Sequence, residues 1–229
     1  MKVAPDRVTM SSSGASGASS GAGVEPSERL VIGVLALQGS YPLHSRAVER
    51  CGAIARRVRK PADLEELRGL ILPGGESTAF AILAHKYGLF EPLRELGRGG
   101  LPMLGTCAGA ILLGRGDEFP ARLGLLAVDV ERNAYGRQLD SFSADIDLEP
   151  FDSPFHAVFI RAPKFRVLDD SEVETLGVCG DDPVLLRGGN ILLTSFHPEL
   201  TDDLRLHQMF LESCRSARPR KSVAQTRTR

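Results

Sequence analysis

The sequence predicts an α/β fold in which helices cover both faces of a mostly parallel central sheet, with a short antiparallel excursion in the second half. Short apolar segments alternate with helical patterns over the first half of the 229-residue chain, as in a doubly wound parallel sheet. The first segment, residues 30–37, is an almost continuous apolar run, which is typical of a strand covered on both faces. From about residue 125, short strand patterns follow one another with little helix between them.

The expected elements follow the chain in a regular order. In the first half they are a strand at 30–37, a helix at 43–51, a strand at 53–58, a short helix at 62–69, a strand at 69–75, a helix at 77–88 with Ser77 or Thr78 near its start, a strand at 101–106 and a helix from about Cys107. In the second half they are strands within 125–133, 143–148, 156–163, 173–178, 183–188 and 190–196, and a closing helix at 201–214 with Thr201 as its N-cap. Because ligands bind outside the carboxyl ends of parallel strands, the breaks at 73–77 and 105–109 predict two loops of one site.

Composition divides the chain into a folded body and two tails. Residues 11–23 read "SSSGASGASSGAG", so we expect residues 1–28 to be a disordered Ser/Gly/Ala-rich extension, 29–214 a single domain, and 215–229 a basic, disordered tail. The net charge of −1 hides an asymmetry, because six Lys or Arg lie in that tail and the rest of the chain has 22 basic against 29 acidic residues. We interpret the tail as solvated and expect no nucleic-acid partner.

Cysteine usage and hydropathy indicate the compartment. Four cysteines, Cys51, Cys107, Cys179 and Cys214, fit no zinc or paired-cysteine pattern. No secretory signal precedes them, so we expect reduced thiols and a cytoplasmic protein. No apolar run reaches the roughly 18–20 residues that a membrane span requires, so we expect no membrane association.

One cysteine lies in a motif with chemical meaning. The stretch "GTCAG", residues 105–109, places Cys107 between two glycines where an apolar strand ends. This spacing is the shape of a nucleophile elbow, in which a sharp strand-to-helix turn lifts the nucleophile above the sheet edge. The alternative is a buried cysteine that packs as a small hydrophobe. The motif therefore needs a base, an orienting group and oxyanion donors elsewhere in the chain.

Two further segments supply those groups. In "SFHPE", His197 and Glu199 are two residues apart, so in extended chain both side chains fall on one face, where the carboxylate can orient an imidazole base. In "PGGES", Gly74 and Gly75 leave room for a backbone N–H to approach a substrate carbonyl, and Ala108 supplies the second donor after the nucleophile. The alternatives are a surface His–Glu pair and a plain tight turn.

The order "PGGES", "GTCAG", "SFHPE" resembles the class I (triad) glutamine amidotransferases. With "GVLALQG", "GTCAGAILL", "VERNAYGRQLDSF", "VFIRAP" and "SFHPELTDD", residues 30–213 are similar to the glutaminase subunit of pyridoxal 5′-phosphate synthase. The resemblance implies a flavodoxin-like three-layer fold and hydrolysis of L-glutamine to L-glutamate and ammonia. It also implies no metal and no organic cofactor. The implied partner is a synthase subunit (PdxS type) in a large hetero-oligomer, to which ammonia is channelled for vitamin B6 biosynthesis.

The resemblance also implies the role of each residue at a matching position. Cys107 is then the nucleophile, His197 the base and Glu199 the orienting group, and the oxyanion donors are the N–H groups of Gly75 and Ala108. The implied glutamine-binding residues are Gly75, Glu76, Ser77, Arg132, Ile160 and Arg161. Glutamine carries both charges at its α-carbon, so arginines suit its carboxylate and a glutamate its ammonium. Which arginine meets which group stays open.

Two other functions stay open at this stage. A triad glutaminase could serve a different synthase, such as that of histidine biosynthesis, and a catalytically silent chain could keep the fold as a binding module. The segments at residues 131–142 and 158–163 favour the vitamin B6 interpretation, and an intact Cys107, His197 and Glu199 argue against a silent module. The loop at 40–43 matches the family only partly.

Overall fold

A computed structural model describes residues 30–116, 121–132 and 141–217. The expected disordered extension at 1–28 and the part of the basic tail from residue 218 onward lie outside the described residues, as do residues 133–140 of the "VERNAYGRQLDSF" segment. The last helix, α5 (Arg205–Ser216), continues two residues into the segment expected as tail.

A seven-stranded sheet forms the centre of the fold, with the strand order β2-β1-β3-β4-β11-β10-β9. Its strands are β1 (Val31–Leu35), β2 (Ile54–Val58), β3 (Gly69–Leu72), β4 (Met103–Thr106), β9 (Glu174–Cys179), β10 (Asp182–Gly188) and β11 (Ile191–Thr194). The five strands from β2 to β11 are parallel, and β10 and β9 add antiparallel pairs at one end. The predicted mostly parallel sheet is confirmed.

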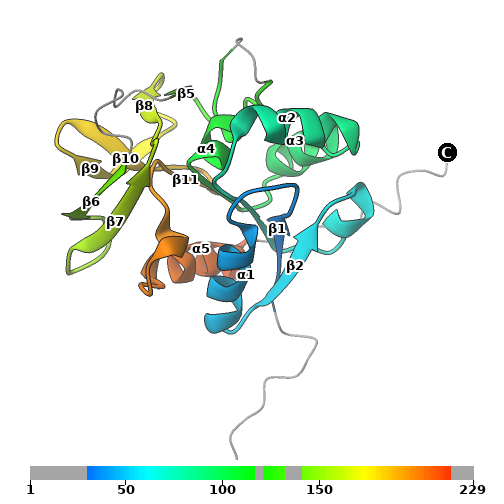
Figure 1. The fold of residues 1–229 in the computed structure, drawn as a ribbon, viewed down its shortest axis with the longest axis horizontal. Helices are drawn as coiled ribbons and strands as arrows, with labels where there is room; N and C mark the ends of the chain where they lie inside the picture. Colours follow the sequence, from blue (N-terminus) through cyan, green and yellow to red (C-terminus); the bar gives the residue numbers. More distant parts are fainter. Residues whose placement is uncertain (1–29, 117–120, 133–140, 218–229) are drawn as a thin grey trace, which may run out of the picture.

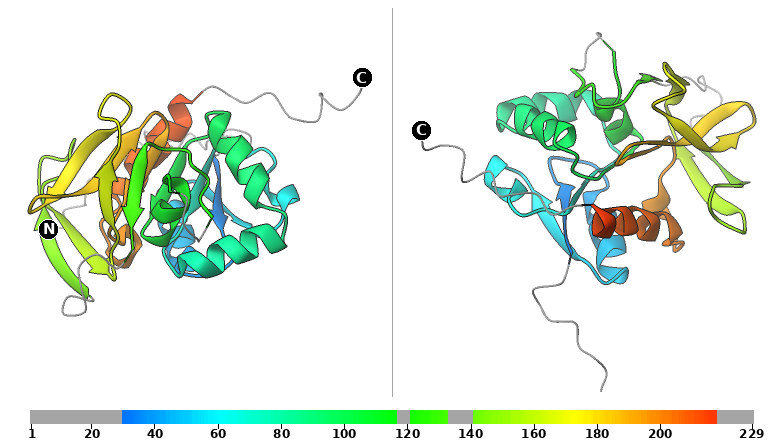
Figure 2. Two further views of the ribbon diagram at one scale, coloured as in Figure 1. Left: turned by 90° about the horizontal axis from the view of Figure 1, so that it is seen from above. Right: turned by 180° about the vertical axis from the view of Figure 1, so that it is seen from behind.

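Helices cover both faces of this sheet (Figures 1 and 2). The helices α1 (Tyr41–Arg50) and α5 lie on one face, and α2 (Ser77–Lys86), α3 (Phe90–Arg98) and α4 (Ala108–Leu113) lie on the other. The alternation of side chains along each strand separates two apolar cores: Leu70 and Leu72 of β3 pack with the α2–α4 layer, whereas Ile71 packs with the α1–α5 layer. The result is the expected three-layer arrangement.

The second half adds two short antiparallel pairs, as predicted. β5 (Val128–Glu131) pairs with β8 (Lys164–Val167), and β6 (Ser141–Ile146) pairs with β7 (Phe155–Ile160). In Figure 1 the β6–β7 pair lies beside the antiparallel end of the main sheet. β7 ends at Ile160, whose carbonyl lies 3.9 Å from Sγ of Cys107 after β4, so this excursion brings the start of the "FIRAP" segment next to the central strands.

The structure differs from the expected elements in four places. The helix expected at 62–69 is only a 3₁₀ turn, η2 (Pro61–Leu64), because Glu66 adopts a left-handed φ of 59°. A second 3₁₀ turn, η3 (Pro198–Leu200), precedes α5, and α5 begins at Arg205 rather than after Thr201 because the Asp203 carboxylate accepts the backbone N–H of Arg205. Helix α3 and strand β8 were not among the expected elements.

The carboxyl ends of three adjacent parallel strands meet at one edge of the sheet. In the register, Leu72 of β3 pairs with Gly105 of β4, and Thr106 of β4 pairs with Thr194 of β11. The segments that follow these strands, 73–77, 107–109 and 195–199, therefore start side by side. The convergence predicted for the first two loops is confirmed, and the "SFHPE" segment joins them.

Among the helices of the described segments, none combines the length and the apolar content that a membrane crossing requires.

The packing of α4 on β3 depends on a glycine, which makes a testable prediction. A Cβ added at Gly109 would lie 1.9 Å from the carbonyl oxygen of Leu72, and this backbone atom cannot rotate away. We expect Gly109→Ala to lower the free energy of unfolding by about 2–3 kcal/mol, the upper part of the range for overpacking. Chemical denaturation measures the change.

The matched control is Gly97→Ala in α3, where the nearest atom is the Cδ1 of Leu125 at 2.3 Å. A leucine side chain can change rotamer, and alanine favours helix, so this variant should lose clearly less stability. Equal losses for both variants would contradict the steric role assigned to Gly109.

Candidate active site

Cys107 occupies a strained turn between β4 and α4. Its φ of 49° and ψ of −106° lie in a region that residues with a Cβ rarely adopt. The backbone N–H of Cys107 donates to the carbonyl of Thr194 on β11 at 2.9 Å, which ties the turn to the neighbouring strand. The side chain is 7% exposed. Strain of this kind is found where a sharp turn presents a nucleophile, so the geometry is that of the predicted elbow.

The glycines on both sides of Cys107 are required by close backbone contacts. A Cβ at Gly105 would lie 2.9 Å from the backbone nitrogen of Ala110, and Gly109 lies against Leu72 as described above. The spacing G-x-C-x-G is therefore dictated by packing of the turn on its own helix and on β3.

His197 lies in the loop after β11 and faces this turn. Its backbone N–H donates to Val158 of β7 at 2.8 Å, and its Nδ1 lies 2.8 Å from Glu199 Oε1. Nε2 is buried and makes no hydrogen bond within the described residues. An interaction of the ring with Cys107 is one of the causes that raise the pKa of His197. The ring packs on Gly74, where a Cβ would lie 2.3 Å from Cε1. Gly74 is therefore needed for the imidazole to occupy this position.

The surroundings of His197 favour its protonated form. Burial by itself disfavours the imidazolium, but the interactions with Cys107 and with the Glu199 carboxylate outweigh burial and raise the pKa of His197 from 6.5 to about 10. An imidazolium beside a sulfur stabilises the thiolate, which is the nucleophilic form of cysteine.

The Glu199 carboxylate is completely buried and held from several sides. Oε1 accepts the hydroxyl of Ser40 at 2.6 Å as well as the hydrogen bond from His197, and Oε2 lies 3.2 Å from His44 Nε2. Burial by itself raises the pKa of this carboxyl group, but His44 and His197 outweigh it and hold the pKa well below 4.5. Glu199 is therefore an ionised hydrogen-bond acceptor that fixes Nδ1 of His197.

The loop at 73–77 is held by the segment that follows β1. The carbonyl of Gly74 accepts the backbone N–H of Ser40 at 3.1 Å, so in the trans peptide the N–H of Gly75 points away from Ser40. The side chain of Gln38 packs on Gly75, where a Cβ would lie 2.5 Å from it, and donates to the carbonyl of Glu76 at 2.8 Å. The orientation of the predicted oxyanion donor at Gly75 thus depends on residues 38–40.

The other residues expected to bind glutamine are only partly brought together. Glu76 caps α2 by accepting the N–H groups of Thr78 and Ala79, and it lies 3.4 Å from Arg132. Burial tends to raise the pKa of Glu76, but these hydrogen bonds and Arg132 lower it overall. Ser77 is buried in the first turn of α2, beside the loop.

Of Ile160 and Arg161, the two other residues expected to bind glutamine, Ile160 lies next to the thiol, because its carbonyl is 3.9 Å from Cys107 Sγ. Arg161 follows with φ of 42° and an exposed side chain that makes no ion pair within the described ranges. Ala108 is the first residue of α4 and is buried. The binding roles of all these residues stay predictions.

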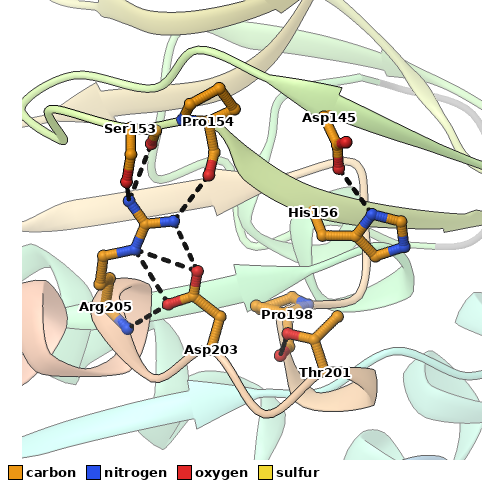
Figure 3. A network of polar contacts seen from close by, with 8 residues as sticks. All are labelled: Asp145, Ser153, Pro154, His156, Pro198, Thr201, Asp203 and Arg205. Carbon is orange, nitrogen blue, oxygen red and sulfur yellow. Dashed lines mark hydrogen bonds and ion pairs between the residues drawn. The ribbon is translucent and has the colours of Figure 1, made fainter.

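The loop that carries His197 and Glu199 is anchored at its far end by Arg205 (Figure 3). The guanidinium pairs with Asp203 at 2.6 Å and donates to the carbonyls of Ser153 and Pro154, each at 2.8 Å. It also lies over the rings of Phe151 and Phe155. These contacts join the start of α5 to the segment before β7, so residues 197–205 are fixed at both ends.

Sequence reasoning missed three contributors to the site: Ser40, His44 and His207. Ser40 was part of a loop that matched the family only partly, yet it contacts both Glu199 and Gly74. His207 lies on the buried face of α5, 163 positions after its partner His44. A histidine on the apolar face of a predicted helix was the available signal, but no local pattern connects it to the active-site loops.

A cysteine elbow, a buried histidine and a buried glutamate at the carboxyl edge of a flavodoxin-like sheet are the arrangement of the triad glutamine amidotransferases. Comparison with known proteins agrees: the model of the SNO glutamine amidotransferase family matches residues 34–216. The chain belongs to this family.

Two relatives show where in the family the chain lies. A pyridoxal 5′-phosphate synthase subunit PdxT of Thermus thermophilus is 54% identical over 188 residues, which cover 80% of this chain and 97% of the relative. The protein of the same name from Pelotomaculum thermopropionicum is 51% identical over 187 residues, which cover 80% and 94%. The resemblance to the glutaminases of pyridoxal 5′-phosphate synthase is confirmed.

Solved structures confirm the fold. A crystal structure titled as a glutamine amidotransferase superposes with a TM-score of 0.75 at 50% identity, over 80% of this chain and 98% of that one. The structure of PurLQS from Thermotoga maritima superposes with a TM-score of 0.58 at 17% identity, over 82% and 98%, and this likeness concerns the fold alone.

The pKa of His197 gives a prediction about stability and pH. The folded-state pKa of His197, about 10, lies above the unfolded value of 6.5. Its contribution to the free energy of unfolding is therefore complete below pH 6.5 and is lost as the pH rises through about 10. Glu199→Gln removes part of what raises this pKa. The stability difference between wild type and Glu199→Gln should therefore be largest near pH 6 and shrink toward pH 10.

Urea denaturation of both proteins at pH 6, 8 and 10 measures this difference. Groups that interact with neither Glu199 nor His197 titrate alike in the two proteins, so the difference isolates the cluster around this pair. A difference that stays constant from pH 6 to pH 10 would mean that Glu199 does not stabilise the imidazolium.

Proposed function

We propose that this chain hydrolyses L-glutamine to L-glutamate and ammonia with Cys107, His197 and Glu199 as its catalytic triad. The observation that carries the proposal is the buried line of thiol, imidazole and carboxylate at the edge where β3, β4 and β11 end. Family membership and relatives of about 50% identity that are named as synthase subunits support the same activity.

The chemistry follows from the order of these groups. The Cys107 thiolate attacks the side-chain amide carbon of glutamine and forms a tetrahedral oxyanion. The C–N bond then breaks, and the leaving nitrogen takes the proton of the His197 imidazolium to depart as ammonia. Neutral His197 next takes a proton from water, which attacks the thioester and releases glutamate. Glu199 keeps Nδ1 of the ring engaged, so that Nε2 exchanges every proton.

Two backbone donors are assigned to the oxyanion. Ala108 N–H follows the nucleophile, and Gly75 N–H belongs to the peptide whose carbonyl is fixed by Ser40. Such a donor contributes about 10²–10³-fold to the rate of acyl transfer. The peptide between Gly74 and Gly75 has no side chain on either side, so it can rotate at low steric cost once the hydrogen bond to Ser40 is released.

Substrate binding is assigned to the groups around the thiol. Arg132 and Arg161 offer paired donors for the α-carboxylate. The Glu76 carboxylate and the Ile160 carbonyl offer acceptors for the α-ammonium, and Gly75 and Ser77 line the loop beside them. Glutamine binding would then place its side-chain amide between Cys107 and the two oxyanion donors.

We further propose that the ammonia is channelled to a PdxS-type synthase subunit in a large hetero-oligomer that makes pyridoxal 5′-phosphate. The relatives' name, pyridoxal 5′-phosphate synthase subunit, supports this partner. Residues 38–40 could connect a bound partner to the site, because Ser40 touches both Glu199 and the Gly74 peptide.

The nucleophile is tested by substitution. Cys107→Ala should lower glutamate production by at least about 10³-fold, since no thioester can form, while the circular dichroism spectrum and thermal midpoint stay close to wild type. The matched controls are Cys51→Ala and Cys179→Ala, which remove half-buried thiols outside the site. Wild-type turnover by Cys107→Ala, or an equal loss in a control, would contradict the proposed triad.

The partner is tested by titration. Purified PdxS-type synthase is added to a fixed amount of the chain, and glutamate production is measured with a synthase of histidine biosynthesis as the control. We expect kcat to rise about 10²-fold or more and to saturate with the PdxS-type subunit, as expected if an oxyanion donor is completed on binding. A rate that stays flat despite demonstrated binding, or that rises only with the control synthase, would overturn the proposed pairing.

A further inference from the structure

Two buried histidines behind the site have no role in the chemistry described so far. His44 lies on α1 and His207 on α5, the two helices that share one face of the sheet (Figure 1), and both are 0% exposed. Burial of polar groups in a core costs free energy unless they are hydrogen bonded. Both rings lie beside the apolar core between α1, α5 and the sheet. Their hydrogen-bond partners must therefore offset the cost of burying them.

The two rings form a line that ends on the catalytic carboxylate. Nε2 of His207 lies 3.0 Å from Nδ1 of His44. Nε2 of His44 is hydrogen bonded to Oγ1 of Thr106 at 3.2 Å, and it lies 3.2 Å from Oε2 of Glu199, a buried oxygen that makes no hydrogen bond within the described residues. The other oxygen of Glu199 meets His197. A continuous set of polar contacts therefore runs from α5 through α1 to the imidazole that faces Cys107.

The direction of the hydrogen bonds follows from the charges at the two ends. The ionised Glu199 can only accept, so the nitrogen of His44 that faces it carries a proton. Burial lowers the pKa of His207 to about 3, so this ring is neutral and donates from one nitrogen only. We assign that donor to Nε2, which faces Nδ1 of His44 and leaves only an acceptor lone pair on the buried Nδ1 of His207 unpartnered.

We propose that His44 is a positioning residue of the glutaminase reaction, and that His207 fixes the tautomer with which His44 holds Oε2 of Glu199. The inference rests on the proposed function. Oε1 of Glu199 is hydrogen bonded to Ser40 and His197, and the only group within 3.2 Å of Oε2 that these contacts show is Nε2 of His44, so both oxygens oppose a rotation of the carboxylate away from Nδ1 of His197. Partners of this kind, behind the residues that react, orient them and are worth about 10–100-fold in metal sites.

The alternative is that the pair only fills space between α1 and α5. A filling role predicts lost stability without a specific effect on turnover. A positioning role predicts a lower kcat with little change in KM, because neither His44 nor His207 touches the substrate. A positioning role also requires the nitrogen of His44 that faces Glu199, Nε2, whereas a filling role requires neither nitrogen in particular. Two variants that each keep a polar group at a different nitrogen position can therefore separate the roles.

The experiment compares His44→Gln with His44→Asn in the full chain, assayed with saturating PdxS-type synthase. Both variants introduce the same amide group. The amide nitrogen of glutamine reaches the place of Nε2 and can donate to Glu199, whereas the shorter asparagine reaches only the place of Nδ1, beside His207. We expect His44→Gln to keep kcat within about fivefold, and His44→Asn to lower it by about 10–100-fold with KM for glutamine within about twofold.

His207→Gln and His207→Leu supply a second, independent comparison. Glutamine keeps a donor for Nδ1 of His44 and should retain more turnover than leucine, which removes it. Thermal midpoints of all four variants are measured alongside, so that rates are compared between folded proteins.

The inference is overturned if His44→Asn turns over glutamine as fast as His44→Gln, or if all four variants change the thermal midpoint but not kcat. A wild-type complex that produces no glutamate would instead refute the proposed function, so the two failures are distinguishable. Loss of folding in His207→Leu alone leaves the decision to the two amide variants of His44.

Discussion

The buried carboxylate of Glu199 is the group on which the site depends. An ionised carboxylate in a protein interior is stable only when donors replace the water it has lost. Here the polar partners come from two separate parts of the chain: Ser40 and His44 at the start of α1, and His197 two residues before Glu199. The same carboxylate keeps the imidazole of His197 protonated beside Cys107. The charge that is costly to bury is therefore also the charge that would favour the thiolate of Cys107, the proposed nucleophile.

Close backbone approach is the second constraint, and it explains where the glycines lie. The Gly39 position has no room for a Cβ, which would meet the carbonyl of Gly74 at 1.9 Å, and Gly74 in turn leaves space for the ring of His197. Gly109 lets α4 pack on β3 directly behind Cys107. These contacts bring the loops at 38–40, 73–77 and 195–199 within hydrogen-bond distance of one another. The positions of Cys107 and His197 therefore depend on the absence of a side chain at Gly109 and Gly74.

The sequence predicted the strands and loops that form this site, because each of them is specified by a pattern of a few adjacent residues. The apolar runs at 30–37 and 69–72, the G-x-C-x-G spacing and the H-x-E pair each follow from a few adjacent residues, and parallel strands bring their carboxyl ends to one edge. Element boundaries were predicted less well. The helix expected at 62–69 ends early at Glu66, whose left-handed backbone has no sequence signature, and α5 begins at Arg205 because of a side-chain contact with Asp203.

The sequence by itself determined the fold class and the family resemblance, and it predicted that Cys107, His197 and Glu199 meet at one edge of the sheet, because spacing along a strand or turn fixes which side chains share an edge. Only the tertiary structure decided what surrounds them. It placed Ser40 on both Glu199 and the Gly74 peptide, turned Glu76 into the cap of α2, and set His207 against His44 across 163 positions of sequence. Such contacts depend on how two helices pack on one face of a sheet, and no pattern within either helix specifies its partner.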